Sequence, residues 1–233
     1  MEEFEPHEVH HTVKLNWLRA AVLGANDGIV SIGALIFGIA GATNSDPIIL
    51  TTGIAGTIAG SLSMGVGEYV SVSSSRDTER ALLEKERIEL KNSPDKELAE
   101  LVVLYERKGL SRATATTVAQ ELTARDAFAA HVDAELRMDP DNLTNPSHAA
   151  IASTLSFIGG AIVPLLAMIL PPASIRIPTA FVAVLLILAV TGALSARVGG
   201  ANVPRAVVRV VFGGALAMAI TYLVGLLFGI TVL

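Results

Sequence analysis

The sequence contains no cysteine and little charge. Without cysteine, the chain has no disulfide framework, no thiolate nucleophile and no cysteine-based zinc or iron–sulfur site. Charged residues make up 17% of the 233 residues, whereas an average soluble domain carries about 25%. The net charge of −5 gives no electrostatic basis for binding nucleic acid. These shortages exclude a water-soluble enzyme built around one globular core.

The charge that is present lies mostly in one part of the chain. Fifteen of the 22 acidic residues fall between Asp77 and Asp141, and eleven of the 17 basic residues fall between Arg76 and Arg137. Elsewhere, five apolar stretches reach the roughly 20 helical residues that a hydrocarbon layer requires. They cover residues 18–42, 47–72, 149–170, 177–196 and 210–233. We therefore predict an all-α membrane protein with five transmembrane helices, because lipid cannot satisfy the open backbone groups of other structures.

The basic residues also predict the orientation in the membrane. With the N-terminus in the cytoplasm, sixteen of the 17 Lys and Arg residues lie at the inner side, and only Arg176 lies outside. Five crossings then leave the C-terminus outside. The chain divides into an acidic, His-rich cytoplasmic tail (1–15), transmembrane helices 1 and 2 (16–75), a cytoplasmic helical insert (76–147), which carries ligand-capable residues, and transmembrane helices 3 to 5 (148–233).

The insert carries helix signals of its own. Residues 69–90 can continue the second membrane helix into water. Ser93 and Pro94 are typical of an N-cap and a first helical position, for a helix that ends near Gly109. Ser111 can cap a third helix, and a fourth is expected from Arg125 to Arg137.

The first apolar stretch contains one acid, Asp27, beside Asn26. At a rise of 1.5 Å per residue, this carboxylate lies about 10 Å along the helix from its cytoplasmic end. An ionised side chain at that depth costs several kcal/mol, so it usually faces a bundle interior, a water-filled cavity or an ion path. We interpret Asp27 as a group that handles ions or protons. The alternative is that Asn26, Ser31 or a neighbouring backbone simply satisfies it.

Met64 and Glu68 lie one turn apart on the second stretch. A thioether beside a carboxylate suits a borderline transition-metal ion better than Ca²⁺ or Mg²⁺. The alternative is that Met64 fills space in the core and Glu68 marks the water interface.

The insert contains three pairs of ligand-capable residues, each pair on one helical face. Six such groups on three helices could form an oxygen-rich site with one imidazole, which matches Fe²⁺ or Mn²⁺. The alternative is that these are solvated helix faces, paired with nearby Lys and Arg. The six residues are Glu86, Glu89, Glu97, Glu100, His131 and Glu135.

The sequence lacks residues that two kinds of membrane or metal enzyme require. An intramembrane aspartyl protease needs a second membrane Asp to share a proton with Asp27, and no other apolar stretch has one. A di-iron carboxylate oxidase would want Glu-x-x-His pairs, but Phe128 stands three residues before His131. We therefore expect no enzymatic activity and no catalytic cofactor.

Four segments together resemble the vacuolar iron transporter family, which includes nodulin-21-like proteins and many bacterial members. They are LGANDGIVS (23–31), SMGVGEYVS (63–71), AHVDAEL (130–136) and GGAIVP (159–164). The resemblance implies a homodimer of five-helix protomers that moves Fe²⁺, and often Mn²⁺, out of the cytosol in exchange for protons. It also implies that Asp27 and Met64 line a path near the dimer interface, and that the glutamates of the insert collect metal.

The chain departs from some family members at two positions. Gly56 stands where plant-like members carry a carboxylate, and Glu68, three turns on, resembles the bacterial pattern instead. His131 stands where some members have methionine; imidazole is a harder ligand than thioether, so the balance among Fe²⁺, Mn²⁺ and Zn²⁺ could differ. The bacterial-like pattern and the lack of a targeting segment favour a bacterial plasma (inner) membrane.

The resulting hypothesis is a proton-coupled exporter. The insert captures metal, Glu68 passes it inward, and Met64 and Asp27 form the membrane site. Pro164 is expected to break the third membrane helix locally and provide a bend. Two alternatives stay open: a membrane-anchored dimeric protein that buffers metal without transport, and a passive channel.

Overall fold

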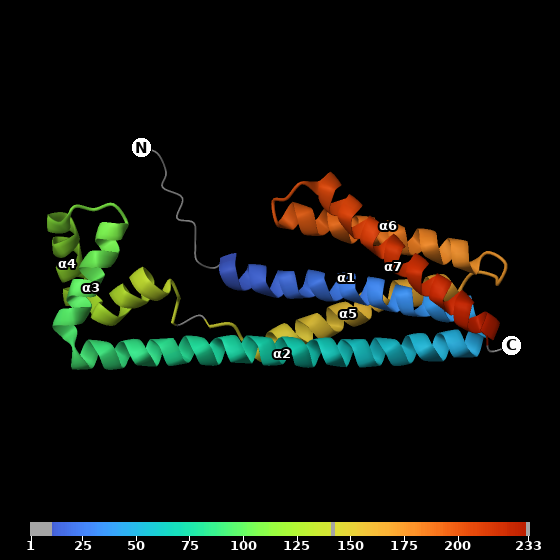
Figure 1. Ribbon diagram of the computed structural model, residues 1–233, viewed down its shortest axis with the longest axis horizontal. Coiled ribbons are helices and arrows are strands. Elements are labelled where there is room, and N and C mark those ends of the chain that lie inside the picture. Colours follow the sequence, from blue (N-terminus) through green and yellow to red (C-terminus); the bar gives the residue numbers. More distant parts are fainter. Residues whose placement is uncertain (1–10, 141–142, 232–233) are drawn as a thin grey trace. The chain divides into compact units, whose positions relative to one another are not determined.

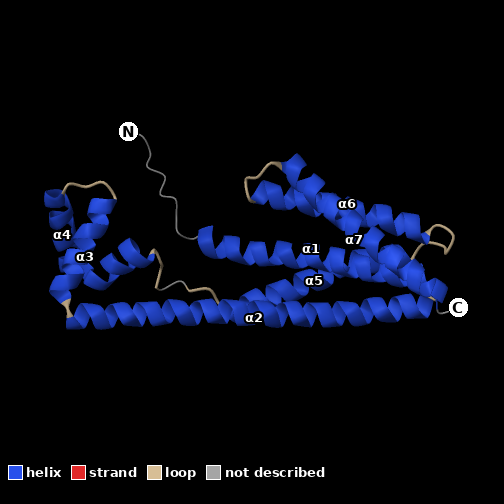
Figure 2. Cartoon of the chain, viewed as in Figure 1, coloured by secondary structure: helices blue, strands red, loops and turns tan. Residues whose placement is uncertain are grey.

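The computed structural model describes residues 11–140 and 143–231, and these residues form helices joined by short turns (Figures 1 and 2). Within those ranges there is no strand. Five helices are long and apolar enough to cross a membrane, which confirms the all-α membrane protein. They are α1 (His11–Ala42), α2 (Asp46–Asn92), α5 (Pro146–Ile169), α6 (Arg176–Val198) and α7 (Val203–Thr231). The first ten residues of the predicted tail lie outside the described residues, and α1 already begins at His11.

The chain forms two compact units. The membrane unit comprises Met1–Val70 and Pro146–Leu233, with α1, the first half of α2, α5, α6 and α7. The insert unit comprises Ser71–Asn145. It holds the second half of α2, then α3 (Pro94–Arg107), α4 (Arg112–His131) and a π-helix, η1 (Val132–Leu136).

In the membrane unit, α1 and α5 approach each other closely at small residues. A Cβ added to Gly28 would lie 2.1 Å from the carbonyl oxygen of Phe157, and one added to Gly160 would lie 2.2 Å from that of Ala25. Small residues permit this approach where van der Waals packing, rather than a hydrophobic driving force, associates helices in lipid. Beside this contact, Ile36, Val184 and Met218 are fully buried in the core.

α2 has 47 residues and is therefore about 70 Å long. A hydrocarbon layer accommodates roughly 20 helical residues, so the rest of α2 extends beyond it, as the sequence predicts. In the membrane unit, α2 packs through glycines. A Cβ on Gly56 would meet the side chain of Leu35 on α1, and one on Gly60 would meet the ring of Phe157 on α5.

Two expectations about the membrane helices are wrong in detail. α7 begins at Val203, seven residues before the predicted start, because Asn202 caps it: the Asn202 Oδ1 accepts the Arg205 N–H at 3.1 Å. An apolar stretch counted from residue 210 misses this polar first turn. α5 runs through Pro164 as one helix, so the predicted local break is not observed.

The helix signals of the insert unit are largely confirmed. Ser93 is the N-cap residue of α3, with Pro94 next, although the Ser93 side chain makes no capping hydrogen bond. Ser111 caps α4 by accepting the Thr114 N–H at 3.3 Å. α4 is interrupted at Asp126, whose Oδ1 accepts the Ala129 N–H at 2.9 Å and starts a new turn. The predicted break between a third and a fourth helix is therefore found at Asp126.

Candidate metal centre

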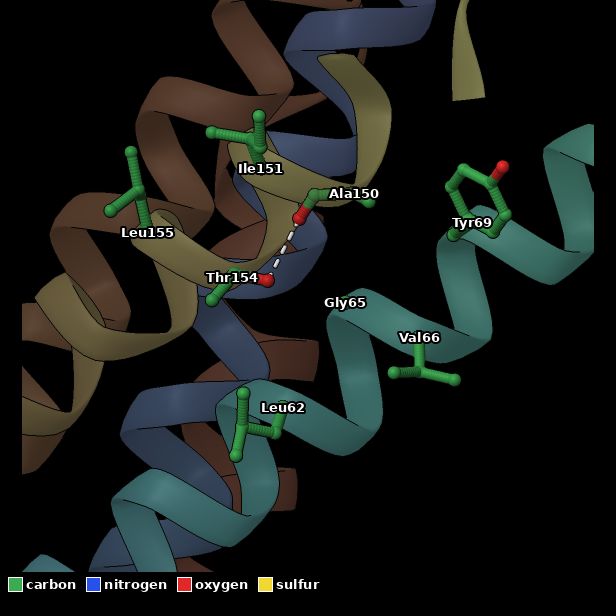
Figure 3. A pocket seen from close by; sticks show the side chains of 8 residues that line it. All are labelled: Leu62, Gly65, Val66, Tyr69, Ala150, Ile151, Thr154 and Leu155. Atoms are coloured by element: carbon green, nitrogen blue, oxygen red, sulfur yellow. Dashed lines mark hydrogen bonds between the residues drawn. The ribbon is translucent and has the colours of Figure 1, made fainter. Parts of the chain in front are cut away.

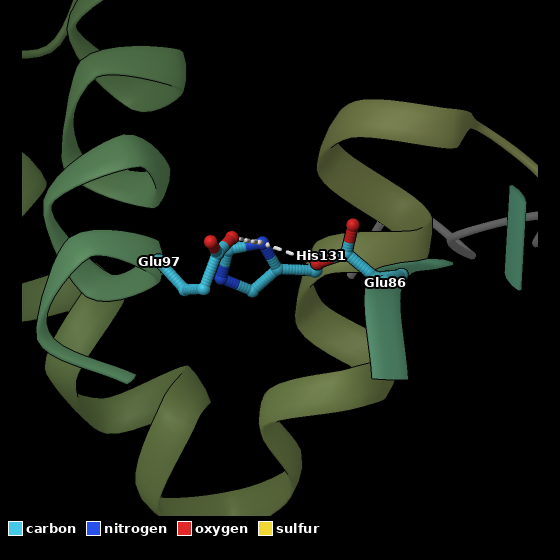
Figure 4. A group of neighbouring side chains, drawn as sticks. All are labelled: Glu86, Glu97 and His131. Carbon is cyan, nitrogen blue, oxygen red and sulfur yellow. Dashed lines mark ion pairs between the residues drawn. The ribbon is translucent and has the colours of Figure 1, made fainter. Parts of the chain in front are cut away.

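Three side chains from three segments meet inside the insert unit: Glu86 on α2, Glu97 on α3 and His131 at the end of α4 (Figure 4). Each offers a ligand atom, and these atoms all lie within 4.8 Å of one another. His131 Nδ1 lies 3.0 Å from Glu86 Oε1 and 3.9 Å from Glu97 Oε2. The residues are 3%, 8% and 0% exposed for Glu86, Glu97 and His131, so the cluster is shielded from water.

Local structure places each of the three residues. Glu97 lies in the first turn of α3, behind the Ser93–Pro94 start. His131 is the last α-helical residue before η1, and π-turns of this kind often occur at functional sites. A small core of Leu101, Ala115 and Ala134 packs these helices together. The alanines leave little volume between the helix backbones, so side chains from different helices can meet.

The cluster leaves buried polar atoms without hydrogen bonds. Glu86 Oε1 and both ring nitrogens of His131 are inaccessible to water and make no hydrogen bond among the described residues. The 3.0 Å approach of His131 to Glu86 therefore lacks hydrogen-bond geometry. An unsatisfied buried polar group costs about 1–3 kcal/mol. Of these atoms, His131 Nδ1 and Glu86 Oε1 face each other, and the Glu97 carboxylate lies beside them, an arrangement that could hold a cation.

The electrostatics of the cluster favour the binding of protons or a cation. Burial, assisted by the charges of the surrounding carboxylates, Glu135 first among them, raises the pKa of Glu86 to about 7. Burial also raises the pKa of Glu97, assisted by Glu100 and opposed by His131. Glu86 lies 14 residues past Val72, outside the apolar part of α2. Near neutral pH the Glu86 carboxyl is therefore partly protonated, and a divalent cation bound there would have to displace that proton.

The other predicted ligands surround this cluster but are not part of it. The charges of Glu89, Glu100 and Glu135 all raise the pKa of Glu86, which places them near it. Glu100 and Glu135 are exposed, and Glu89 forms an ion pair with Lys85 at 3.2 Å. For Glu89, the solvated-face interpretation thus holds in the structure. Two carboxylates and one imidazole thus form the inner cluster, a combination that could hold Fe²⁺, Mn²⁺ or Zn²⁺.

The membrane residues are arranged differently. Asp27 is exposed on the surface of the single chain rather than buried in its bundle, and Ser31 Oγ donates to Asp27 Oδ1 at 2.6 Å. Asn26 is half-buried, and its Oδ1 accepts from Thr191 Oγ1 at 2.7 Å, which joins α1 to α6. The Ser31 contact was among the expected ones, whereas Thr191 was not. The apolar stretch 177–196 holds three hydroxyl residues, Thr179, Thr191 and Ser195, so no signal in the sequence singles out Thr191.

Met64 and Glu68 are both half-buried, and Met64 packs against the apolar core of the membrane unit. Within the described residues, no hydrogen bond or ion pair joins Asp27, Met64 and Glu68. A groove of about 470 Å³ lies between α2 and α5, and Gly65, the residue after Met64, lines it (Figure 3). Thr154 Oγ1 donates to the Ala150 carbonyl at 2.8 Å, and no carboxylate, imidazole or thioether lines the groove, so it is largely apolar and offers no typical metal ligand.

One ion pair of the membrane unit was missed by the sequence analysis. Arg176 at the start of α6 is bonded to Asp46 at the start of α2, although 130 positions separate them. The sequence marked Arg176 only as the single basic residue on the outer side. Its partner explains how a nearly buried guanidinium is tolerated there.

Comparisons with known proteins agree with this architecture. The model of the VIT family matches residues 18–226. The vacuolar iron transporter of Acanthamoeba castellanii is 46% identical over 212 residues, which cover 91% of this chain and 78% of that protein. Vacuolar iron transporter homolog 1 of Oryza sativa subsp. japonica is 36% identical over 222 residues, covering 95% and 78%. Vacuolar iron transporter homolog 2.1 of Arabidopsis thaliana is 35% identical over 219 residues, covering 94% and 84%. The chain belongs to the VIT family, in agreement with its five membrane helices and its four characteristic sequence segments.

Proposed function

We propose that the protein exports a divalent transition metal, Fe²⁺ and also Mn²⁺, from the cytosol in exchange for protons. The observation that carries this proposal is the buried cluster of Glu86, Glu97 and His131 with its unpaired polar atoms. The names of the relatives, which are iron transporters or their homologs, support the choice of metal. In this proposal the insert unit captures metal, with Glu89, Glu100 and Glu135 attracting cations around the inner three ligands.

The membrane step assigns a role to Asp27. An ionised carboxylate on the membrane-facing surface of one chain costs several kcal/mol, so something must cover it. We propose that a second copy of the chain does so, which makes the protein a homodimer with Asp27 and Met64 lining a path between the protomers. Glu68 passes metal toward that path. Asn26, held by Thr191, fixes the segment of α1 that carries Asp27.

The proposed orientation places the N-terminus and the insert unit in the cytosol and the C-terminus on the other side, following the distribution of Lys and Arg. The sequence-based expectation of a bacterial plasma membrane receives no support from the relatives, which are eukaryotic and carry vacuolar names. The orientation is the same for either membrane, because a vacuolar lumen corresponds to the cell exterior.

The test is metal flux in proteoliposomes, with and without an imposed pH difference, for Fe²⁺, Mn²⁺, Zn²⁺ and Ca²⁺. We expect Fe²⁺ and Mn²⁺ flux that a proton gradient drives, and loss of that flux in Asp27→Asn while the insert unit still binds metal. A metal buffer would bind Fe²⁺ without moving it. A passive channel would give flux that ignores the proton gradient, and either result would refute the exporter.

A further inference from the structure

A second polar pocket lies in the insert unit, away from the metal cluster. It has a volume of about 490 Å³ and lies between α2 and the segment that leads back toward α5. Three arginines and one glutamate supply its charge, so its lining is net positive. The lining residues are Arg76, Arg80, Leu83, Glu84, Arg87, Pro140 and Leu143.

The arginines differ in how they are already engaged. Arg87 lies over the ring of Phe128, 4.7 Å from its centroid, and 3.7 Å from Glu84 Oε2. By contrast, neither Arg76 nor Arg80 forms an ion pair with any described residue. The Nε of Arg76 is inaccessible to water and has no hydrogen-bond partner there. Two guanidinium groups without a carboxylate partner thus line the same pocket.

The position of these arginines on α2 indicates that an anion bound in the pocket would come from the lipid headgroups. Val72 is the last apolar residue before the polar part of α2, and Arg76 and Arg80 follow it by about 6 Å and 12 Å along the helix axis. The headgroup layer of a bilayer is roughly 5–8 Å thick on each side. Arg76 therefore falls in that layer, and the long side chain of Arg80 can reach back to it.

We propose that Arg76 and Arg80 bind the phosphate group of an anionic membrane lipid in this pocket. The planar guanidinium pairs with phosphate through two parallel hydrogen bonds, and basic residues next to a membrane helix attract anionic lipids. Leu83, Pro140 and Leu143 supply apolar contact beside the headgroup. Because α2, Pro140 and Leu143 all line the pocket, one bound lipid contacts both ends of the insert unit.

The test uses the full-length protein in neutral detergent and counts bound lipid by native mass spectrometry. Phosphatidylglycerol and phosphatidylcholine are offered at equal concentration, and inorganic phosphate is a separate arm. We expect a preference for phosphatidylglycerol that falls about fivefold in Arg80→Gln and at least tenfold in Arg76→Gln/Arg80→Gln. Arg80 is exposed, so its single substitution does not endanger the fold.

The matched control is Arg107→Gln/Arg112→Gln, which removes the same charge from exposed positions outside the pocket. The proposal is wrong if this control loses phosphatidylglycerol equally, or if Arg76→Gln/Arg80→Gln loses none. It is also wrong if these two arginines bind inorganic phosphate while the protein shows no preference between the two lipids, since the ligand would then be a soluble anion. Lipid binding is measured without transport, so this result stands apart from the exporter proposal.

Discussion

Nδ1 of His131 lies 3.0 Å from Oε1 of Glu86 in the interior of the insert unit, yet the two atoms form no hydrogen bond. A close pair of buried polar atoms without hydrogen-bond geometry is costly for a protein to maintain by itself. The arrangement becomes favourable when a third partner, a cation, lies between them and Glu97. Under the proposed function, the cluster therefore has a geometry that suits a bound cation better than it suits the empty protein.

Removal of one inner ligand tests this interpretation directly. We expect His131→Gln and Glu97→Gln each to weaken Mn²⁺ binding to the full-length protein at least about tenfold, because three ligands define the site. Isothermal titration calorimetry at constant pH measures the effect. Glu121→Gln is the matched control, since it removes an exposed carboxylate outside the cluster. Equal affinities in the control and the ligand variants would place the metal elsewhere.

The affinity for metal should depend on pH through Glu86. Its pKa is about 7 in the folded protein, and metal binds the deprotonated carboxylate. Mn²⁺ affinity should therefore fall about tenfold per pH unit below 7 and level off above it. Calorimetry in buffers of different ionisation enthalpy should detect about half a proton released from Glu86 at pH 7. An affinity that stays flat between pH 5.5 and 7 would contradict the raised pKa.

The same raised pKa predicts a conflict between stability and metal binding. In the folded protein Glu86 ionises near pH 7, against 4.5 for the ordinary group, so the folded state binds more protons. The stabilising contribution of the protonated carboxyl is fully present below pH 4.5 and is lost as the pH rises through 7. At pH 8 this loss reaches up to about 3 kcal/mol.

The metal-free Glu86→Gln protein should therefore resist unfolding better than wild type at pH 8, and the difference should shrink toward pH 5. Hydrogen exchange of the α3 and α4 amides, corrected for the intrinsic pH effect, reports on the insert unit alone. Glu121→Gln should change nothing. If Glu86→Gln instead loosened α3 and α4 at pH 8, the carboxylate would be stabilising the metal-free fold.

Much of the fold followed from the sequence because lipid imposes length and apolarity on each crossing helix. What failed was the start of α7, where Asn202 caps a polar first turn that no apolar stretch can include. Helical periodicity also predicted three pairs among the six candidate ligands of the insert, and one member of each pair lies in the buried cluster. It could not rank the members of a pair, because residues three apart share a face and both Glu86 and Glu89 satisfy the pattern.

The choice between them depends on tertiary packing. The interruption of α4 at Asp126 and the π-turn after His131 set which side chains reach the interior. Neither feature has a periodic signature. The exposure of Asp27 could not be predicted from the sequence either. Periodicity does not show which face of a membrane helix packs against its own bundle and which face stays on the surface of the single chain.

Two adjacent glycines of α5 allow a controlled test of the membrane packing. A Cβ on Gly160 would lie 2.2 Å from the backbone oxygen of Ala25, so Gly160→Ala must push α1 away from α5, at a cost of about 1–3 kcal/mol. A Cβ on Gly159 would meet nothing within 4 Å. Gly159→Ala should be neutral or slightly stabilising, because alanine favours the helix over glycine. Thermal unfolding in detergent, followed by circular dichroism, should therefore separate the neighbours clearly. Equal melting temperatures for the two variants would show that α1 and α5 do not touch at Gly160.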